Sequence, residues 1–109
     1  DLLPKNKKLQ LKVSEYTDDY FMTFNEWINN NITNYGFYRP YQNYNNGVAM
    51  EPWHISYFSI ADKALKQLDL DHVHNLIVKN NILGKSLICE QLPMIYERFI
   101  CNINHYNEV

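Results

Sequence analysis

A glutamate and a histidine stand three residues apart near the centre of the chain, in the string Gly47-Val-Ala-Met-Glu51-Pro-Trp53-His54. A neutral imidazole binds zinc at about 2.0–2.1 Å, and a catalytic zinc ion keeps one coordination position open for water. A nearby carboxylate can take the proton from that water as it attacks a carbonyl. These residue types suit hydrolytic zinc chemistry, with His54 as a metal ligand and Glu51 as the general base.

The spacing alone does not single out this chemistry, because a Glu-x-x-His pair also arises by chance. A partly buried, hydrogen-bonded His54 beside a surface Glu51 accounts for the same residues. The zinc interpretation also makes a geometric demand. Residues Val48 to Phe58 are rich in β-branched and aromatic types and are predicted to form a strand. Residues three apart on a strand point to opposite faces, so the two side chains can share one ion only if the backbone bends at Pro52.

The longer string around this pair resembles a known family motif. Glu51-Pro52-Trp53-His54 is similar to the Glu-x-Trp-His motif of the VanY-type D,D-carboxypeptidases, zinc metallopeptidases that share a fold with the hedgehog signalling domain. The resemblance covers most of the chain and includes four more segments: Asn25-Glu26-Trp27, Gly36-Phe37-Tyr38-Arg39-Pro40-Tyr41, Ile82-Leu83-Gly84-Lys85 and Leu92-Pro93-Met94-Ile95-Tyr96-Glu97-Arg98.

The resemblance implies a role for each residue of the motif. His54 matches the last zinc ligand, Glu51 matches the general base, and Trp53 matches an aromatic residue that is expected to pack beside the site. The implied activity is release of the terminal D-alanine from peptidoglycan stem peptides that end in D-Ala-D-Ala. The implied location is the cell envelope or periplasm.

Three further residues are candidates for lining the substrate cleft. Ser56 and Tyr57 follow the motif, and strand alternation predicts that one of them faces away from His54. Arg39 carries a guanidinium that matches the geometry of a carboxylate. Its place beside Pro40 in a connector favours a structural salt bridge or a contact with a carbonyl oxygen.

The matched region contains only part of the family's metal site. The family takes its other two zinc ligands, a His and an Asp, and an arginine for the substrate carboxylate, from a motif further upstream. Catalytic zinc normally has three protein ligands, and His54 is one. We therefore expect Zn²⁺ in the intact protein, with the remaining ligands upstream of Asp1. We expect this chain alone to be inactive and to need that N-terminal segment as its partner.

The elements that must position the motif predict an α+β fold. It corresponds to the C-terminal part of a hedgehog/D,D-peptidase-like domain, with antiparallel strands followed by a helical tail. Alternating Leu9, Leu11 and Val13 predict a short strand. Helical spacing of apolar residues predicts a helix from Asp18 to Tyr35, ended by a glycine in the left-handed conformation.

The second half of the chain has the periodicity of helices. Turn-forming residues predict a connector over residues 36–46, and helical patterns begin at Ile60. A break is expected near Asn80 to Gly84, and Pro93 is expected to kink the last helix or to start its second half. Residues 1–59 are thus predicted to be the C-terminal half of a catalytic domain, and residues 60–109 a helical tail that packs on it.

Composition narrows the classes of partner. The 109 residues have a formal net charge of −2 and an isoelectric point near 6.1, so the basic stripe of a nucleic-acid-binding protein is missing. No apolar run has the length that spans a bilayer. With 46% hydrophobic and 20% charged residues, the composition is ordinary for a globular protein.

Two other functions account for the same sequence. The chain is also consistent with a non-catalytic cell-wall or peptide-binding module on the same fold, whose groove is lined by the aromatic run Phe37, Tyr38, Tyr41 and Tyr44. A third possibility is an α+β domain without a site, in which the Glu and His of the motif cap a strand bend. Zinc binding that depends on the motif histidine discriminates between these hypotheses.

Overall fold

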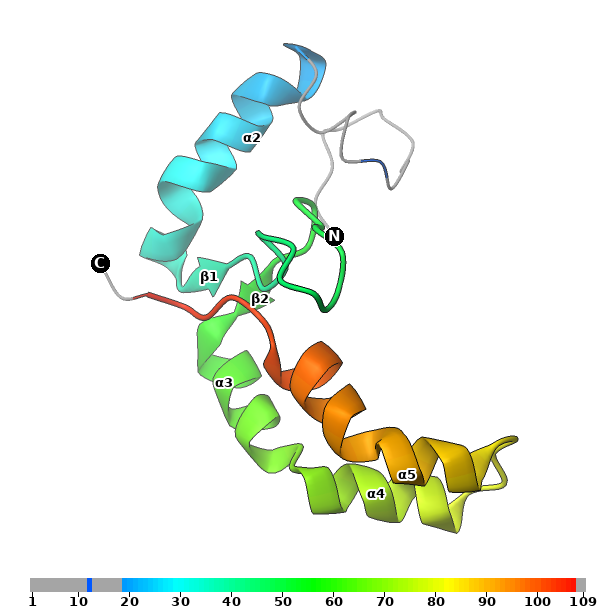
Figure 1. The fold of residues 1–109 in the computed structure, drawn as a ribbon. Helices are drawn as coiled ribbons and strands as arrows, with labels where there is room; N and C mark the ends of the chain where they lie inside the picture. Colours follow the sequence, from blue (N-terminus) through cyan, green and yellow to red (C-terminus); the bar gives the residue numbers. More distant parts are fainter. Residues whose placement is uncertain (1–11, 13–18, 108–109) are drawn as a thin grey trace.

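The computed structural model describes Lys12 and residues 19–107, and it confirms an α+β fold (Figure 1). Its helices are α2 (Asp19–Asn31), α3 (Phe58–Gln67), α4 (Leu70–Lys79) and α5 (Lys85–Ile95), with a 3₁₀ turn η1 (Ile32–Tyr35) and a π-helical turn η2 (Tyr96–Cys101). Strands β1 (Phe37–Tyr38) and β2 (Ser56–Tyr57) pair antiparallel, with Phe37 opposite Tyr57 and Tyr38 opposite Ser56. The predicted strand at Leu9, Leu11 and Val13 lies outside the described residues.

The first predicted helix is confirmed over its described part, and it provides much of the core. α2 and η1 together run from Asp19 to Tyr35 and bury Phe21, Ile28 and Ile32 on one face. Gly36 ends the helical segment with φ +77°, the left-handed conformation that glycine adopts most easily. The chain then enters β1 directly, so α2 and the small sheet are held in a fixed relation.

The predicted strand from Val48 to Phe58 is wrong for most of its length. β2 covers only Ser56–Tyr57, α3 begins at Phe58, and residues 48–55 form turns and irregular backbone. Pro52 has no N–H to contribute to a strand ladder. Strand propensity largely reflects how well a side chain packs on a half-buried surface. Here Trp53 packs from a turn instead, with only 5% of its surface exposed.

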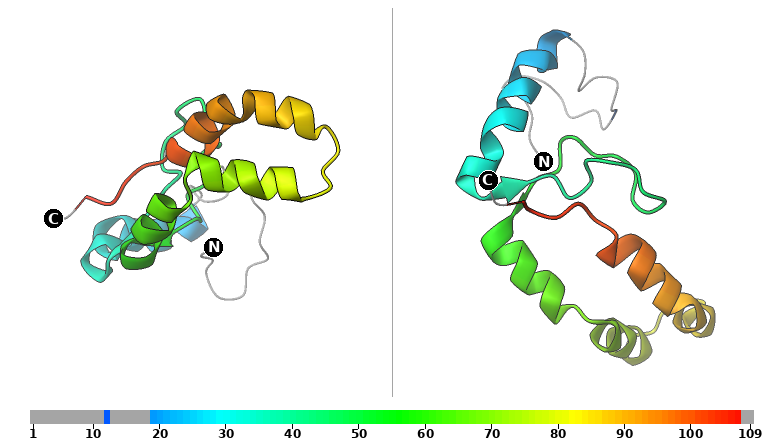
Figure 2. Two further views of the ribbon diagram at one scale, coloured as in Figure 1. Left: turned by 90° about the horizontal axis from the view of Figure 1, so that it is seen from below. Right: turned by 60° about the vertical axis from the view of Figure 1, so that its left-hand side comes forward.

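The helical tail starts two residues earlier than predicted and extends away from the sheet. α4 and α5 lie side by side as an antiparallel pair (Figures 1 and 2). Asp69 caps α4 by accepting a hydrogen bond from the His72 amide at 2.7 Å. The predicted break falls between Lys79 and Lys85. Pro93 lies inside α5, and the wider turn η2 follows that helix directly.

The C-terminal segment, residues 102–107, returns from the helical tail to the sheet (Figure 1). The Asn104 amide donates to the Pro40 carbonyl at 2.8 Å. The Tyr106 ring stacks on Phe58 with a centroid distance of 4.7 Å. Tyr106 also donates its hydroxyl proton to the Thr33 carbonyl at 3.0 Å. The end of the tail therefore contacts η1, the connector after β1 and the start of α3.

Candidate functional site

A tight turn brings the two chemically suited side chains together. The His54 amide donates to the Glu51 carbonyl at 3.1 Å, which closes a turn with Pro52 and Trp53 at its centre. Nδ1 of His54 lies 3.2 Å from Oε2 of Glu51. The sequence placed a sharp bend at Pro52, and the structure has it. The turn replaces the bent strand that the sequence suggested.

The side chains of the Glu51–His54 pair are partly exposed. The side chains of His54 and Glu51 are 36% and 32% exposed. When the imidazole proton lies on Nδ1, it is donated to the carboxylate, and the lone pair of the ring is then on Nε2. This arrangement orients the imidazole for binding a metal or a proton through Nε2, as carboxylate–histidine pairs do beside metal ions.

Trp53 anchors the turn to the hydrophobic core. Its side chain belongs to the hydrophobic core with Phe21 of α2, and Phe24 packs against the same cluster. A buried aromatic ring stabilises a fold mainly because its large apolar area is removed from water. The prediction that Trp53 is a packing residue is therefore confirmed, and the motif is tied to α2 through it.

Tyr41 is a site neighbour that the motif did not reveal. Its ring lies edge-on to the His54 ring, with centroids 4.9 Å apart and an interplanar angle of 81°. Its carbonyl accepts a hydrogen bond from the Glu51 amide at 2.9 Å. Both members of the pair thus contact the connector after β1. The sequence placed Tyr41 only in an aromatic run, and no spacing linked it to residues ten positions away.

Ser56 and Tyr57 point to different surroundings, as strand alternation predicts. Ser56 lines a pocket of about 380 Å³ together with Tyr41, Tyr38 and apolar residues of α3 and η2. Tyr57 packs on Phe37 with centroids 5.0 Å apart, and 42% of its surface is exposed. Ser56 therefore shares a pocket with a neighbour of His54, whereas Tyr57 packs along the sheet.

Tyr38 gives this pocket a polar wall. Burial raises the pKa of the Tyr38 phenol above its ordinary value, and the negative charge of Asp62 raises it further. A hydrogen bond with Ser56 acts in the opposite direction. Tyr38 consequently remains a neutral hydrogen-bonding group over the whole physiological range of pH.

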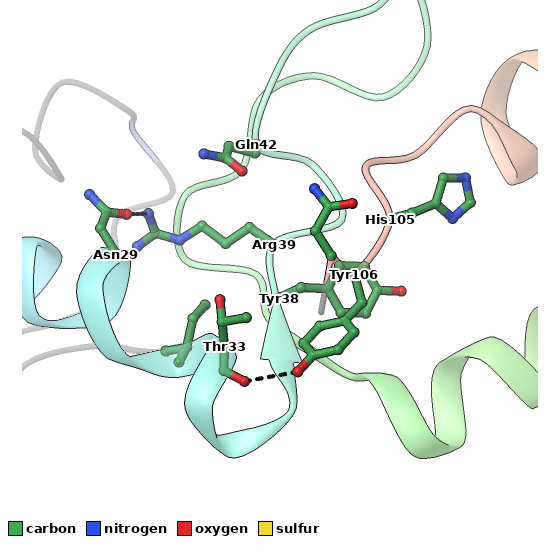
Figure 3. A pocket seen from close by; sticks show the side chains of 9 residues that line it. Asn29, Thr33, Tyr38, Arg39, Gln42, His105 and Tyr106 are labelled. Carbon is green, nitrogen blue, oxygen red and sulfur yellow. Dashed lines mark hydrogen bonds between the residues drawn. The ribbon is translucent and has the colours of Figure 1, made fainter. Parts of the chain in front are cut away.

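Arg39 is directed toward helix α2 and is 8% exposed. Its guanidinium donates to the side-chain oxygen of Asn25 at 2.7 Å and to that of Asn29. It also lines a polar pocket of about 130 Å³, bordered by Tyr38, Thr33 and Tyr106 among others (Figure 3). These amide contacts match the structural carbonyl contact that the sequence left open for Arg39.

The aromatic run of the connector does not form one continuous surface. Tyr38 and Tyr41 line the same pocket, whereas Phe37 packs on Tyr57 and Tyr44 is 63% exposed. A peptide groove along all four rings therefore has no counterpart in this arrangement, although two of the rings share a cavity.

The metal chemistry needs more ligands than these residues supply. Among the described residues, no three His, Cys, Asp or Glu side chains gather as a metal site requires. His54 and Glu51 offer one imidazole and one carboxylate, and catalytic zinc sites normally use three protein ligands. The described residues by themselves therefore do not fit a catalytic zinc ion.

Comparisons with known proteins bear on the same region. The family model for D-alanyl-D-alanine carboxypeptidase, VanY, matches residues 1–60. An uncharacterized protein of Haemophilus influenzae (strain ATCC 51907 / DSM 11121 / KW20 / Rd) is 34% identical over 103 residues, which cover 92% of this chain and 79% of that protein. An alignment of that length extends beyond residue 60 and includes most of the sequence of the helical tail. No solved structure matches. In the part of the chain that the structure describes, every helix is too short or too polar to cross a bilayer.

Proposed function

Because the chain belongs to the VanY family of D-alanyl-D-alanine carboxypeptidases, we propose that it forms the C-terminal part of a zinc-dependent D,D-carboxypeptidase. The proposed substrates are peptidoglycan stem peptides, and the proposed product is the terminal D-alanine. The observation that carries the proposal is the turn that brings Oε2 of Glu51 within 3.2 Å of Nδ1 of His54. In this proposal residues 1–59 belong to the catalytic domain, and residues 60–109 are the tail.

Glu51 is the proposed general base. The carboxylate removes a proton from water as the water oxygen attacks the carbonyl carbon of the scissile peptide bond. The C–N bond then breaks, and Glu51 returns the proton to the leaving amine of D-alanine. Partial exposure of the side chain gives water access to the carboxylate.

His54 is the proposed metal ligand, through one of its two ring nitrogens. Two further protein ligands are expected from the sequence upstream of Asp1, as the family resemblance implies. Zinc held there would supply Lewis-acid polarisation of the scissile carbonyl and of the attacking water. The proposal therefore concerns the intact protein, and it assigns no zinc affinity to the described residues alone.

The neighbours of the pair have proposed supporting roles. Ser56 lines the pocket that continues from Tyr41, so we assign it to the substrate cleft. Trp53 and Arg39 hold the turn and the end of β1 against α2, and Tyr57 supports the sheet. Because members of the family act on the cell wall, we place the protein in the cell envelope or periplasm.

The proposal is tested by following D-alanine release from a peptide ending in D-Ala-D-Ala, with the full-length protein and added zinc. We expect Glu51→Ala to lower turnover by about 10²–10⁴, the usual contribution of a general base. Zinc affinity should change little in this variant. His54→Ala should lose both zinc binding and turnover. Tyr44→Phe, which removes a hydroxyl from an exposed ring, is the matched control and should retain both.

Three results distinguish the alternatives. Unchanged turnover in Glu51→Ala removes that residue from the role of base. A drop of about 10–100-fold in zinc affinity in the same variant assigns it instead to orienting the His54 ring. No zinc binding by the full-length protein, together with retained affinity for peptidoglycan, supports the non-catalytic binding module.

A further inference from the structure

The connector between β1 and the Glu51–His54 turn has little regular structure of its own. This connector, residues 39–50, forms turns and irregular backbone, and residues 42–46 are polar. A segment of this kind takes a fixed conformation only when other parts of the protein satisfy its backbone groups. The identity of those other parts determines what positions the site.

The hydrogen bonds come from the C-terminal segment, about sixty residues away along the chain. Asn104 makes three of them. Its backbone amide donates to the Pro40 carbonyl at 2.8 Å, and its side-chain oxygen accepts from the amides of Gln42 at 3.1 Å and Asn43 at 3.2 Å. The three partners lie on both sides of Tyr41, so Asn104 fixes the backbone around that residue.

Neighbouring residues of the tail hold the next part of the connector. The Asn45 side-chain amide donates to the Asn102 side-chain oxygen at 2.8 Å, and the Asn102 amide nitrogen donates to the Asn45 carbonyl at 2.5 Å. Arg98 donates to the Asn46 carbonyl. At Gly47 the backbone passes so close that a Cβ atom would overlap the carbonyl oxygen of Arg98.

Tyr41 of the connector contacts both members of the pair. The Tyr41 carbonyl accepts the hydrogen bond of the Glu51 amide, and the Tyr41 ring lies against the edge of the His54 ring. Asn104 therefore reaches both members of the pair through Tyr41.

We propose that Asn104 is a positioning residue for the Glu51–His54 site, and that the end of the helical tail sets the geometry of the catalytic turn through Tyr41. This inference rests on the proposed hydrolytic function. It assigns the tail, which lies beyond the residues matched by the family model, a part in the reaction.

Asn104→Ala in the full-length protein removes the acceptor for Gln42 and Asn43. We expect kcat for D-alanine release to fall about 10–100-fold, because a displacement of about 1 Å has effects of that size in an active site. KM should change much less. Asn104→Asp keeps a side-chain oxygen in the same place and should restore kcat to within about threefold of the wild type. Asn104→Gln, with the same amide one methylene further out, should give an intermediate kcat.

Tyr106→Phe is the matched control. It removes one hydrogen bond from the same C-terminal segment, but that bond goes to Thr33 of η1 and not to the connector. Its ring can still stack on Phe58. If the tail contributed only general stability, Tyr106→Phe and Asn104→Ala would affect kcat equally, and that result would overturn the proposal.

An NMR measurement separates this inference from the proposed function. The ring protons of His54 lie beside the Tyr41 ring, so their chemical shifts report the placement of Tyr41 whether or not the protein hydrolyses peptides. We expect Asn104→Ala, or Asn104→Gln if the alanine variant does not fold, to move these resonances, and Tyr106→Phe to leave them in place. Unmoved His54 resonances in the Asn104 variants would refute the positioning role. Moved resonances in a protein without hydrolytic activity would retain it and reject only the hydrolase.

Discussion

The region around the site and the helical tail are built in opposite ways. Residues 36–57 contain two strands of two residues each, yet this stretch includes Arg39 and Trp53, which are only 8% and 5% exposed. The helices α3 and α4 are regular over ten residues each, yet none of their described residues is buried. The irregular region depends on tertiary contacts, whereas α3 and α4 depend on their own hydrogen bonding, and α4 also packs against α5.

The difference shows that a site can be held in place without stable regular secondary structure around it. The Glu51–His54 turn is held by the buried ring of Trp53, by the neighbouring Tyr41 and, through Tyr41, by the distant Asn104. The tail carries large apolar side chains in solvent, including Leu83 at 99% exposure, and these contribute little to the core. Among the described residues, Arg98, Asn102 and Asn104 of the tail make hydrogen bonds with the connector. Mutations in the two regions should therefore differ in the size and in the type of their effects.

The largest expected effect tests this comparison directly. Trp53→Ala removes a side chain that is 5% exposed from the cluster with Phe21, and should lower the free energy of unfolding by about 3–5 kcal/mol. Leu83→Ala changes a fully solvated side chain and should stay within about 0.5 kcal/mol of the wild type. Urea unfolding followed by circular dichroism measures both. Equal losses in the two variants would contradict the division into a buried and a solvated region.

A smaller effect is expected where the two regions meet. Gly47→Ala places a methyl group against the carbonyl oxygen of Arg98, and backbone cannot move aside as easily as a flexible side chain. We expect a loss of about 1–3 kcal/mol in the free energy of unfolding, the usual range for overpacking.

Gly84 provides the control for that substitution. It has φ +72°, and no other atom lies within 4 Å of the place that an added methyl group would take. Gly84→Ala therefore adds backbone strain without a clash between the two regions. The His54 ring resonances should move in Gly47→Ala and remain in place in Gly84→Ala. Movement in both variants would show that the contact at Gly47 does not specifically connect the tail to the site.

The sequence predicted the helices better than the region that holds the site. Helical spacing located α2 and η1, and Gly36 marked their end, because periodicity and a left-handed glycine are local properties. The strand over residues 48–58 failed because its aromatic and β-branched residues satisfy a packing requirement that a turn also meets. Local patterns do not distinguish these two ways of burying Trp53.

The sequence predicted that Glu51 and His54 form a pair, but it did not predict which residues surround them. The Glu-x-x-His spacing and Pro52 together indicated a bend, and the observed turn brings the two side chains within 3.2 Å. The contacts of Tyr41 with His54, and of Asn104 with the connector, depend on chain segments that meet only after folding. No spacing in the sequence encodes a hydrogen bond between residues about sixty positions apart.

The smallest expected effect concerns pH and the wall of the pocket beside the site. Because burial raises the pKa of Tyr38 in the folded protein, the native state holds this proton more tightly than the unfolded chain does. The resulting stabilisation is fully present below the ordinary tyrosine pKa of about 10 and is lost as the pH rises through the higher folded value. Tyr38→Phe has no such proton, so its free energy of unfolding should fall less steeply above about pH 10 than that of the wild type. Below about pH 9 the variant should differ only by a constant offset, from loss of the hydrogen bond with Ser56.

Urea unfolding at a series of pH values measures the two slopes, and Tyr44→Phe, on an exposed ring, controls for removal of a hydroxyl. Parallel curves for the wild type and Tyr38→Phe would show that the pocket lined by Tyr38 is as well solvated as the tail. The contrast between the two regions would then not include this pocket.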